Sequence, residues 1–282
     1  MSNNQPIGIF DSGVGGLTVY RALREKLPHE DFIYLGDTAR LPYGTKTPET
    51  IARYAQEITE RLTQENIKML VIACNTATAH GLAHLRSLWP VLPCLGVITP
   101  GAQAAAAATQ NGRVVVLATE GTVRSGAYQK ALRRINPSFE VEGIGCNLLA
   151  ALVEEGWENS AEGDALIRRY LSQITMKDYD TLVLGCTHFP ILADAIKRLI
   201  PTSVRVIDSA NTTAVAAADY LAERGMLNGQ TSAGSSRFLV TDGLARFQSV
   251  MQRFSGGLAG EAVGLVSLPQ AVDKVESARI TA

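Results

Sequence analysis

Short apolar runs alternate along most of the chain with longer segments in which apolar residues recur at helical spacing. The apolar runs predict strands near residues 7–10, 32–36, 69–74, 94–98, 114–119, 139–145, 181–186, 205–209 and 237–242. The helical spacing predicts helices such as 48–65, 121–135 and 209–225. Because strands that alternate with helices are typical of parallel sheets covered on both faces, we expect an α/β fold with mainly parallel sheets flanked by helices.

The order of these elements also repeats along the chain. The segments 7–13 and 114–121 each place a strand before a helix that begins with small residues, and a later strand in each half ends in a cysteine, Cys74 or Cys186. The repeat predicts two pseudo-symmetric lobes with the active site in the cleft between them. We expect residues 1–97 plus 208–282 to form the first lobe and residues 98–207 to form the second.

Composition excludes several classes of protein. The 282 residues carry 26 lysines and arginines against 27 aspartates and glutamates, so the net charge of −1 gives no field that would attract nucleic acid. The longest apolar runs have strand length, well below the roughly 20 residues that a membrane span needs. Residues 1–6 lack the charged and apolar regions of a signal peptide. We therefore expect a cytoplasmic protein with neither a membrane nor a nucleic-acid partner.

The chain contains cysteines only at positions 74, 94, 146 and 186, and no two of them form a Cys-x-x-Cys pair. This spacing gives no support for a zinc site or for thioredoxin-like chemistry, and we expect free thiols in a reducing compartment. A free cysteine is most often a small buried hydrophobic residue, which is the interpretation for Cys94 and largely for Cys146.

Cys74 and Cys186 differ from the other two cysteines because each ends an apolar run and precedes polar side chains. Asn75 and Thr76 follow the first, and Thr187 and His188 follow the second. Ligands bind at the C-terminal ends of strands in open α/β sheets, so both thiols are expected at a ligand site. Two thiols that face a small molecule from opposite sides suit a reaction that removes a proton on one face of a carbon and returns one on the other.

The neighbouring polar groups fit this chemistry. The positive end of the helix that begins at Asn75 is expected to lower the pKa of the Cys74 thiol. Asn75, Thr76 and Thr187 can donate hydrogen bonds to a carboxylate. The imidazole of His188 can relay protons and stabilise a thiolate at Cys186.

Two further loops are expected at the same sheet ends. In 10–16, backbone N–H groups at a helix start and the Ser12 hydroxyl can hold a carboxylate, which leaves Asp11 to act on an amine or thiol. A dinucleotide site is a weaker interpretation because the glycines do not complete Gly-x-Gly-x-x-Gly. In 39–46, Tyr43 and backbone N–H groups can contact a ligand, although an ordinary Pro-x-Gly turn is an equal alternative.

Other interpretations leave part of the pattern unexplained. His80 and His84 share a helix face, but no glutamate lies between them in His-Glu-x-x-His order, so a packed or surface pair is expected rather than a metal site. A cysteine hydrolase that uses Cys186 and His188 gives Cys74 no role. A non-catalytic binding protein for a small carboxylate gives neither thiol a role.

The segments 10–17, 41–44, 74–77, 184–190 and 206–209 together resemble the glutamate racemase family, within the cofactor-independent aspartate/glutamate racemase superfamily. The resemblance covers residues from about 7 to 255. It implies an isomerase that interconverts L- and D-glutamate for peptidoglycan synthesis by a two-base proton transfer, without pyridoxal phosphate or metal, and it implies a homodimer. A sister racemase that acts on aspartate or another small acid remains the alternative.

The resemblance also implies roles for individual residues. Cys74 and Cys186 match the catalytic thiols, Asp11 the group that assists the first, and His188 the group that assists the second. A supporting carboxylate matches Glu154, with the adjacent Glu155 as the alternative. The implied substrate contacts are Asp11, Ser12, Tyr43, Gly44, Asn75, Thr76, Thr187 and His188.

Overall fold

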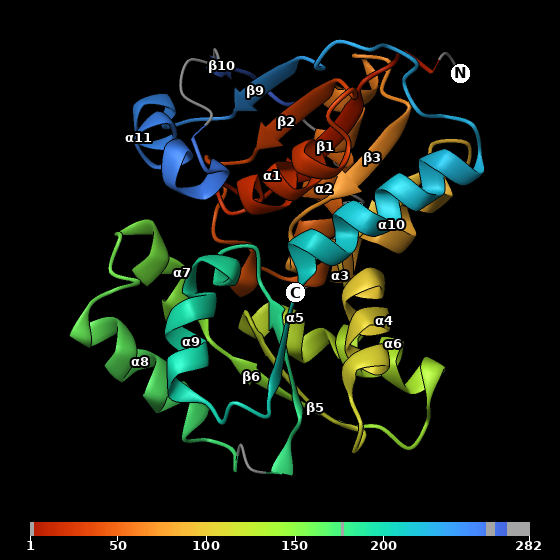
Figure 1. Cartoon of the computed structure of the whole chain (residues 1–282). Helices are drawn as coiled ribbons and strands as arrows, with labels where there is room; N and C mark the ends of the chain where they lie inside the picture. Colours follow the sequence, from red (N-terminus) through yellow and green to blue (C-terminus); the bar gives the residue numbers. More distant parts are fainter. Residues whose placement is uncertain (1–2, 176–177, 258–262, 270–282) are drawn as a thin grey trace, which may run out of the picture.

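The computed structural model of the protein describes residues 3–175, 178–257 and 263–269, which form two parallel sheets (Figure 1). The first sheet has the spatial order β10 (Val263–Leu265), β9 (Ser236–Val240), β2 (Phe32–Gly36), β1 (Ile7–Asp11), β3 (Met69–Ile72) and β4 (Cys94–Gly96). The second has the order β6 (Glu140–Gly145), β5 (Arg113–Ala118), β7 (Thr181–Gly185) and β8 (Arg205–Asp208). Every pair of neighbouring strands is parallel.

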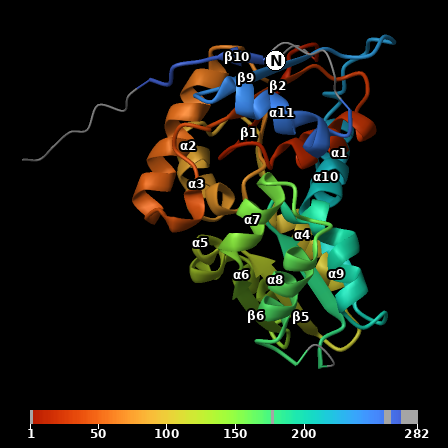
Figure 2. The ribbon, with the colours of Figure 1, turned by 90° about the vertical axis from the view of Figure 1, so that its left-hand side faces the viewer.

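Helices flank both sheets, and the two bodies lie one above the other (Figures 1 and 2). The elements around the first sheet are α1 (Leu17–Lys26), η1 (Tyr43–Thr45), α2 (Pro48–Thr63), α3 (Asn75–Leu88), α10 (Ser209–Glu223) and α11 (Leu244–Ser255). Those around the second are α4 (Ile98–Ala108), α5 (Glu120–Ser125), α6 (Ala127–Ile135), α7 (Asn147–Glu154), α8 (Ala161–Leu171), η3 (Phe189–Leu192) and α9 (Ala193–Leu199). None of the described helices has the length and apolarity to cross a membrane.

The pseudo-symmetry predicted from the repeat is present in the strand order. The series β2-β1-β3-β4 of the first sheet corresponds to β6-β5-β7-β8 of the second, so β3 and β7 occupy equivalent places. Cys74 and Cys186 follow these two strands. The sheets draw their strands from the segments expected for the two lobes, which supports the division into 1–97 plus 208–282 and 98–207 that we propose. Residues 270–282 of that first lobe lie outside the described residues.

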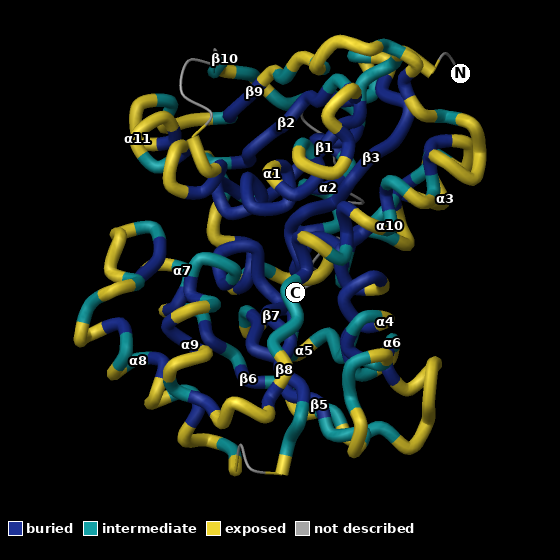
Figure 3. The backbone as a smooth tube through the Cα atoms, viewed as in Figure 1, coloured by how far each residue is buried: buried dark blue, intermediate teal, exposed yellow. Residues whose placement is uncertain are grey.

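The strands have continuous apolar sequences because they are buried on both faces of each sheet. All the residues of β1, β2 and β7 are buried, because helices cover both faces of each sheet (Figure 3). Each fully buried Val, Leu or Ile side chain contributes about 1.5–3 kcal/mol relative to an exposed one. The sheets therefore form rigid supports that hold the loops at their carboxyl ends.

The predicted strands and helices are confirmed with small shifts of their bounds, and two details differ. The predicted helix 121–135 is two helices, α5 and α6, because the chain turns at Gly126 with a φ of +64°. Glycine adopts this left-handed conformation without steric cost. The short strand β10 was not predicted. The expected helix start at Pro48 is confirmed, since Thr47 caps it by accepting a hydrogen bond from the Thr50 N–H.

Candidate active site

A cavity between the carboxyl ends of the two sheets is lined by residues of both lobes. The structure brings together in its wall the predicted residues Ser12, Tyr43, Gly44, Cys74, Asn75, Thr76, Glu154, Cys186, Thr187 and His188. Asp11 does not line this cavity; it is fully buried at the end of β1 and bonded to Thr187. Segments far apart in the sequence therefore meet at one site.

Cys74 is the N-cap of α3, and its Sγ accepts a hydrogen bond from the Ala77 N–H at 3.4 Å. Burial, together with the charge of Asp11, raises the pKa of the Cys74 thiol to about 12, although hydrogen bonds from Ala77 and Ser12 act in the opposite direction. The lowering predicted from the helix end is thus outweighed by desolvation. At neutral pH, Cys74 of the free protein is a protonated thiol.

Asp11 is a buried carboxyl that joins the two lobes. Its Oδ2 accepts a hydrogen bond from the Gly13 N–H at 2.9 Å, and its Oδ1 accepts one from Oγ1 of Thr187 at 3.4 Å. Burial raises the pKa of Asp11, while the positive charge of His188 and the N–H groups of Gly13 and Gly16 oppose the rise. A carboxyl with a raised pKa beside Cys74 is a group that can accept and return a proton.

Cys186 lies beside an imidazole held by a carboxylate. Nδ1 of His188 is 3.8 Å from Sγ of Cys186, and Nε2 of His188 is 2.9 Å from Oε1 of Glu154. Burial disfavours the charged imidazole, but hydrogen bonds to Cys186 and Glu154 outweigh it and raise the pKa of His188 to about 10. His188 is therefore an imidazolium at neutral pH, which places an exchangeable proton next to the sulfur.

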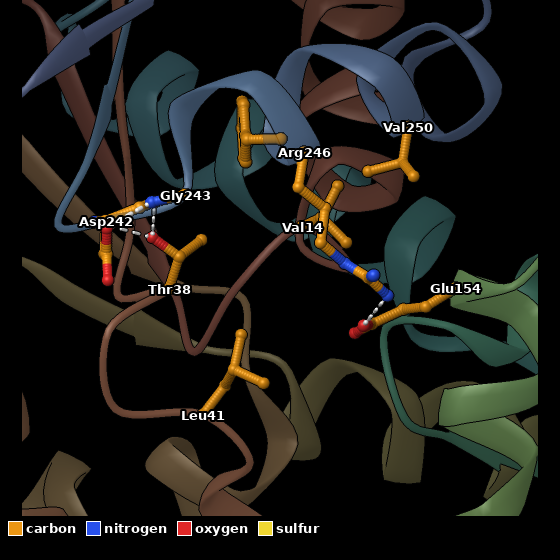
Figure 4. A pocket seen from close by; sticks show the side chains of 9 residues that line it. Val14, Thr38, Leu41, Glu154, Asp242, Gly243, Arg246 and Val250 are labelled. Carbon is orange, nitrogen blue, oxygen red and sulfur yellow. Dashed lines mark hydrogen bonds and ion pairs between the residues drawn. The ribbon is translucent and has the colours of Figure 1, made fainter.

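The geometry distinguishes Glu154 from its neighbour Glu155. Burial would raise the pKa of Glu154, but the hydrogen bond and charge of His188, with Arg246, hold it below its ordinary value. Arg246 reaches from α11 toward Glu154, and its Nη2 lies 3.7 Å from Oε2 of that carboxylate (Figure 4). The same Nη2 lies 2.8 Å from Oε1 of the exposed Glu155. Arg253, also on α11, donates to the backbone carbonyl of Glu154. Glu154 is thus the carboxylate that contacts His188.

The first turn of α3 offers hydrogen-bond donors to the cavity. Nδ2 of Asn75 is buried and has no hydrogen-bond partner among the described residues. Oγ1 of Thr76 lies 2.8 Å from Oγ1 of Thr119 and 3.0 Å from Oγ1 of Thr122, so three hydroxyls of two lobes meet. Sequence reasoning missed Thr119 and Thr122. The internal repeat could have indicated Thr119, because Thr119 directly follows β5 just as Ser12 directly follows β1.

Tyr43 lines the cavity, but its hydroxyl is engaged elsewhere. It donates to the buried carboxylate of Asp37, which also accepts from Nε of Arg40 at 2.7 Å. This network fixes the loop that carries Tyr43 and Gly44 against the site. A ligand contact by this loop therefore uses the backbone rather than the phenol group.

The remaining histidines and cysteines have other contacts. Nε2 of His80 lies 3.2 Å from the Gly121 carbonyl, and Nε2 of His84 lies 2.9 Å from Oε1 of Gln56, as expected for a packed or surface pair. All the cysteines are free and buried. The thiol of Cys94 donates to the backbone carbonyl of Leu92, and the thiol of Cys146 donates to that of Ile144.

Comparison with known proteins gives consistent matches. A family profile described as Asp/Glu/Hydantoin racemase matches residues 7–217. A glutamate racemase of Geobacter metallireducens is 49% identical over 255 residues, which cover 90% of this chain and 94% of that protein.

Two solved structures are also similar. Glutamate racemase isoform RacE1 of Bacillus anthracis has a TM-score of 0.91 at 37% identity, covering 95% of this chain and 100% of that one. Glutamate racemase of Francisella tularensis, solved in complex with D-glutamate, has a TM-score of 0.87 at 35% identity, covering 95% and 98%.

Proposed function

This chain belongs to the Asp/Glu/hydantoin racemase family, as a glutamate racemase, and we propose that Cys74 and Cys186 are its two proton-transferring groups. The enzyme is an isomerase that interconverts L- and D-glutamate and supplies D-glutamate for peptidoglycan. The observation that carries the proposal is the pair of buried thiols that follow equivalent strands of two lobes and line one cavity.

The substrate must lose a weakly acidic α-proton while its carboxylate stays charged, so the site has to stabilise developing negative charge with preorganised donors. Such donors lie together at the start of α3. They are the buried Nδ2 of Asn75, the hydroxyl of Thr76 and the N-terminal end of the helix itself. Ser12, Thr187 and the backbone of Tyr43 and Gly44 complete the proposed substrate contacts. Closure of the two lobes around the substrate excludes water, which strengthens each of these interactions.

Proton transfer then uses the two walls of the cavity. In one direction the Cys186 thiolate removes the α-proton and the Cys74 thiol, protonated at neutral pH, delivers its proton to the opposite face of the carbon. The reverse direction exchanges these roles. Asp11 and His188 assist Cys74 and Cys186, respectively, because each can hold or return a proton beside its thiol. Glu154 keeps His188 charged and oriented.

Single substitutions of the two thiols test this function. Cys74→Ser and Cys186→Ser are each expected to lower kcat by at least about 100-fold, because a serine hydroxyl is a far weaker acid and base than a thiol. Circular dichroism of L-glutamate, and separately of D-glutamate, follows the loss of optical activity. Cys94→Ala is the matched control, since Cys94 is a buried thiol outside the cavity wall.

The outcome that would contradict the proposal is near-normal racemisation by either serine variant. The same assay with L-aspartate addresses the alternative substrate. Rapid turnover of L-aspartate with none of L-glutamate would assign the site to the shorter acid.

We further propose that the protein acts in the cytoplasm as a homodimer, with glutamate as its small-molecule substrate and without a nucleic-acid or membrane partner. The resemblance to glutamate racemases and the nearly balanced charge of the chain support this assignment. Sedimentation velocity with and without D-glutamate tests the dimer. A single monomeric species at micromolar concentration under both conditions would exclude it.

A further inference from the structure

A buried hydrogen bond between the lobes reaches the substrate-binding amide, and none of the roles above uses it. The hydroxyl of Tyr128, near the start of α6 in the second lobe, donates to Oδ1 of Asn75 in the first lobe at 2.8 Å. Tyr128 is only 1% exposed and Asn75 only 3%. Both groups are thus shielded from water. A buried polar group that is left without a hydrogen-bond partner costs about 1–3 kcal/mol.

This bond decides which end of the Asn75 amide faces the cavity. With Oδ1 engaged by Tyr128, the NH₂ group is directed away from the phenol, and its Nδ2 is the buried atom without a partner among the described residues. The opposite orientation would present Oδ1 to the substrate carboxylate, where two acceptors repel each other. It would also leave the phenol proton with no acceptor within the described part of the chain.

The phenol of Tyr128 is a hydrogen-bond donor at neutral pH. Burial, and then the charge of Cys186, raises the pKa of Tyr128 above its ordinary value, so the hydroxyl keeps its proton. The ring is also held in place, since Gly101 of α4 packs against it: a Cβ at that position would lie 3.3 Å from the hydroxyl oxygen. The donor is therefore fixed in both protonation and position.

We propose that Tyr128 is a positioning residue that locks the amide of Asn75 as a hydrogen-bond donor to the substrate carboxylate. The inference rests on the proposed function, in which Asn75 binds the substrate. Because Tyr128 and Asn75 belong to different lobes, the amide is locked only while the lobes are together. The same bond thus links closure of the cleft to the readiness of the site.

Tyr128→Phe tests this role, since it removes one hydroxyl and keeps the ring. We expect KM for both enantiomers to rise about 10-fold, a free-energy difference of about 1.4 kcal/mol, with a smaller change in kcat. The pH profile keeps its shape, because no titrating group of the reaction is lost. Tyr20→Phe is the matched control: it removes a buried phenol hydroxyl bonded to Ser236 at 2.7 Å, remote from the cavity.

A double-mutant cycle separates positioning from a structural role. In an Asn75→Ala background the amide is absent, so Tyr128→Phe is expected to change kcat/KM by less than about 2-fold. Thermal melting of each variant verifies that it is folded.

Two results would overturn the inference: an unchanged KM in folded Tyr128→Phe, or an equal loss in both backgrounds. Failure of the unmodified protein to racemise glutamate would instead refute the proposed function, so the two failures are distinguishable.

Discussion

Replacing Glu154 by Gln removes the carboxylate that keeps His188 charged, while it preserves the size of the side chain and an oxygen that accepts a hydrogen bond. The pKa of His188 is about 10, against an ordinary 6.5. At about 1.36 kcal/mol per pKa unit, this difference corresponds to about 5 kcal/mol in favour of the imidazolium. Burial opposes this stabilisation of the imidazolium, and the hydrogen bonds and charges of Cys186 and Glu154 together provide it. Loss of the Glu154 charge removes one of the interactions that raise the pKa of His188, so this pKa is expected to fall.

The pH dependence of kcat/KM measures this change. A histidine with a raised pKa is charged below that value and loses its proton as the pH rises through it, so activity that needs the imidazolium persists in the wild type up to about pH 10. In Glu154→Gln the alkaline decline should begin at a clearly lower pH than in the wild type. Activity near pH 6 should change much less.

The neighbouring residue provides a matched control for this experiment. Glu155→Gln alters a side chain that is exposed and pairs with Arg246 rather than with His188, so its profile should match the wild type. An alkaline limb in Glu154→Gln that coincides with that of the wild type would refute the assignment of His188 as a carboxylate-held imidazolium.

Two further substitutions test the packing around the site and the stability of the first lobe. In Gly15→Ala the new Cβ would lie 2.5 Å from Nδ1 of His188 and against Thr187, so kcat should fall at least about 10-fold as the imidazole is displaced; wild-type kinetics would contradict this close approach. Lys68→Ala breaks a buried pair in which Nζ lies 2.6 Å from Glu30, and urea denaturation should show a loss of about 3–5 kcal/mol; a loss under about 1 kcal/mol would show that the pair contributes little.

Most of the architecture could be predicted because it depends on local patterns. Strands covered on both faces are continuous apolar runs in the sequence. A cysteine that ends such a run, as Cys74 and Cys186 do, can therefore be placed at the end of a sheet from the sequence alone. The strand β10 was not predicted because it has only three residues and none of them is buried. The break at Gly126 was not predicted because a single glycine is compatible with a continuous helix.

The roles that the sequence did not reveal, or left open between two residues, depend on contacts between distant parts of the chain. Tyr128 lies in an amphipathic helix where an aromatic residue is expected in the core, and only its hydroxyl contact with Asn75 shows another role. Glu154 and Glu155 are equivalent in sequence, and the end of α7 decides which one contacts His188. The pKa of Cys74 was predicted in the wrong direction because desolvation depends on burial by the whole fold.

The central claim is that two thiols act on opposite faces of one carbon, and the early reaction of L-glutamate in D₂O tests it most directly. Proton NMR and chiral separation measure α-deuterium in each enantiomer before much substrate has reacted. The account predicts that the newly formed D-glutamate carries deuterium delivered by one thiol, while the remaining L-glutamate keeps the protium that the other thiol has not exchanged. D-glutamate that retains the original α-proton would show that a single group both removes and returns it, and would contradict the account.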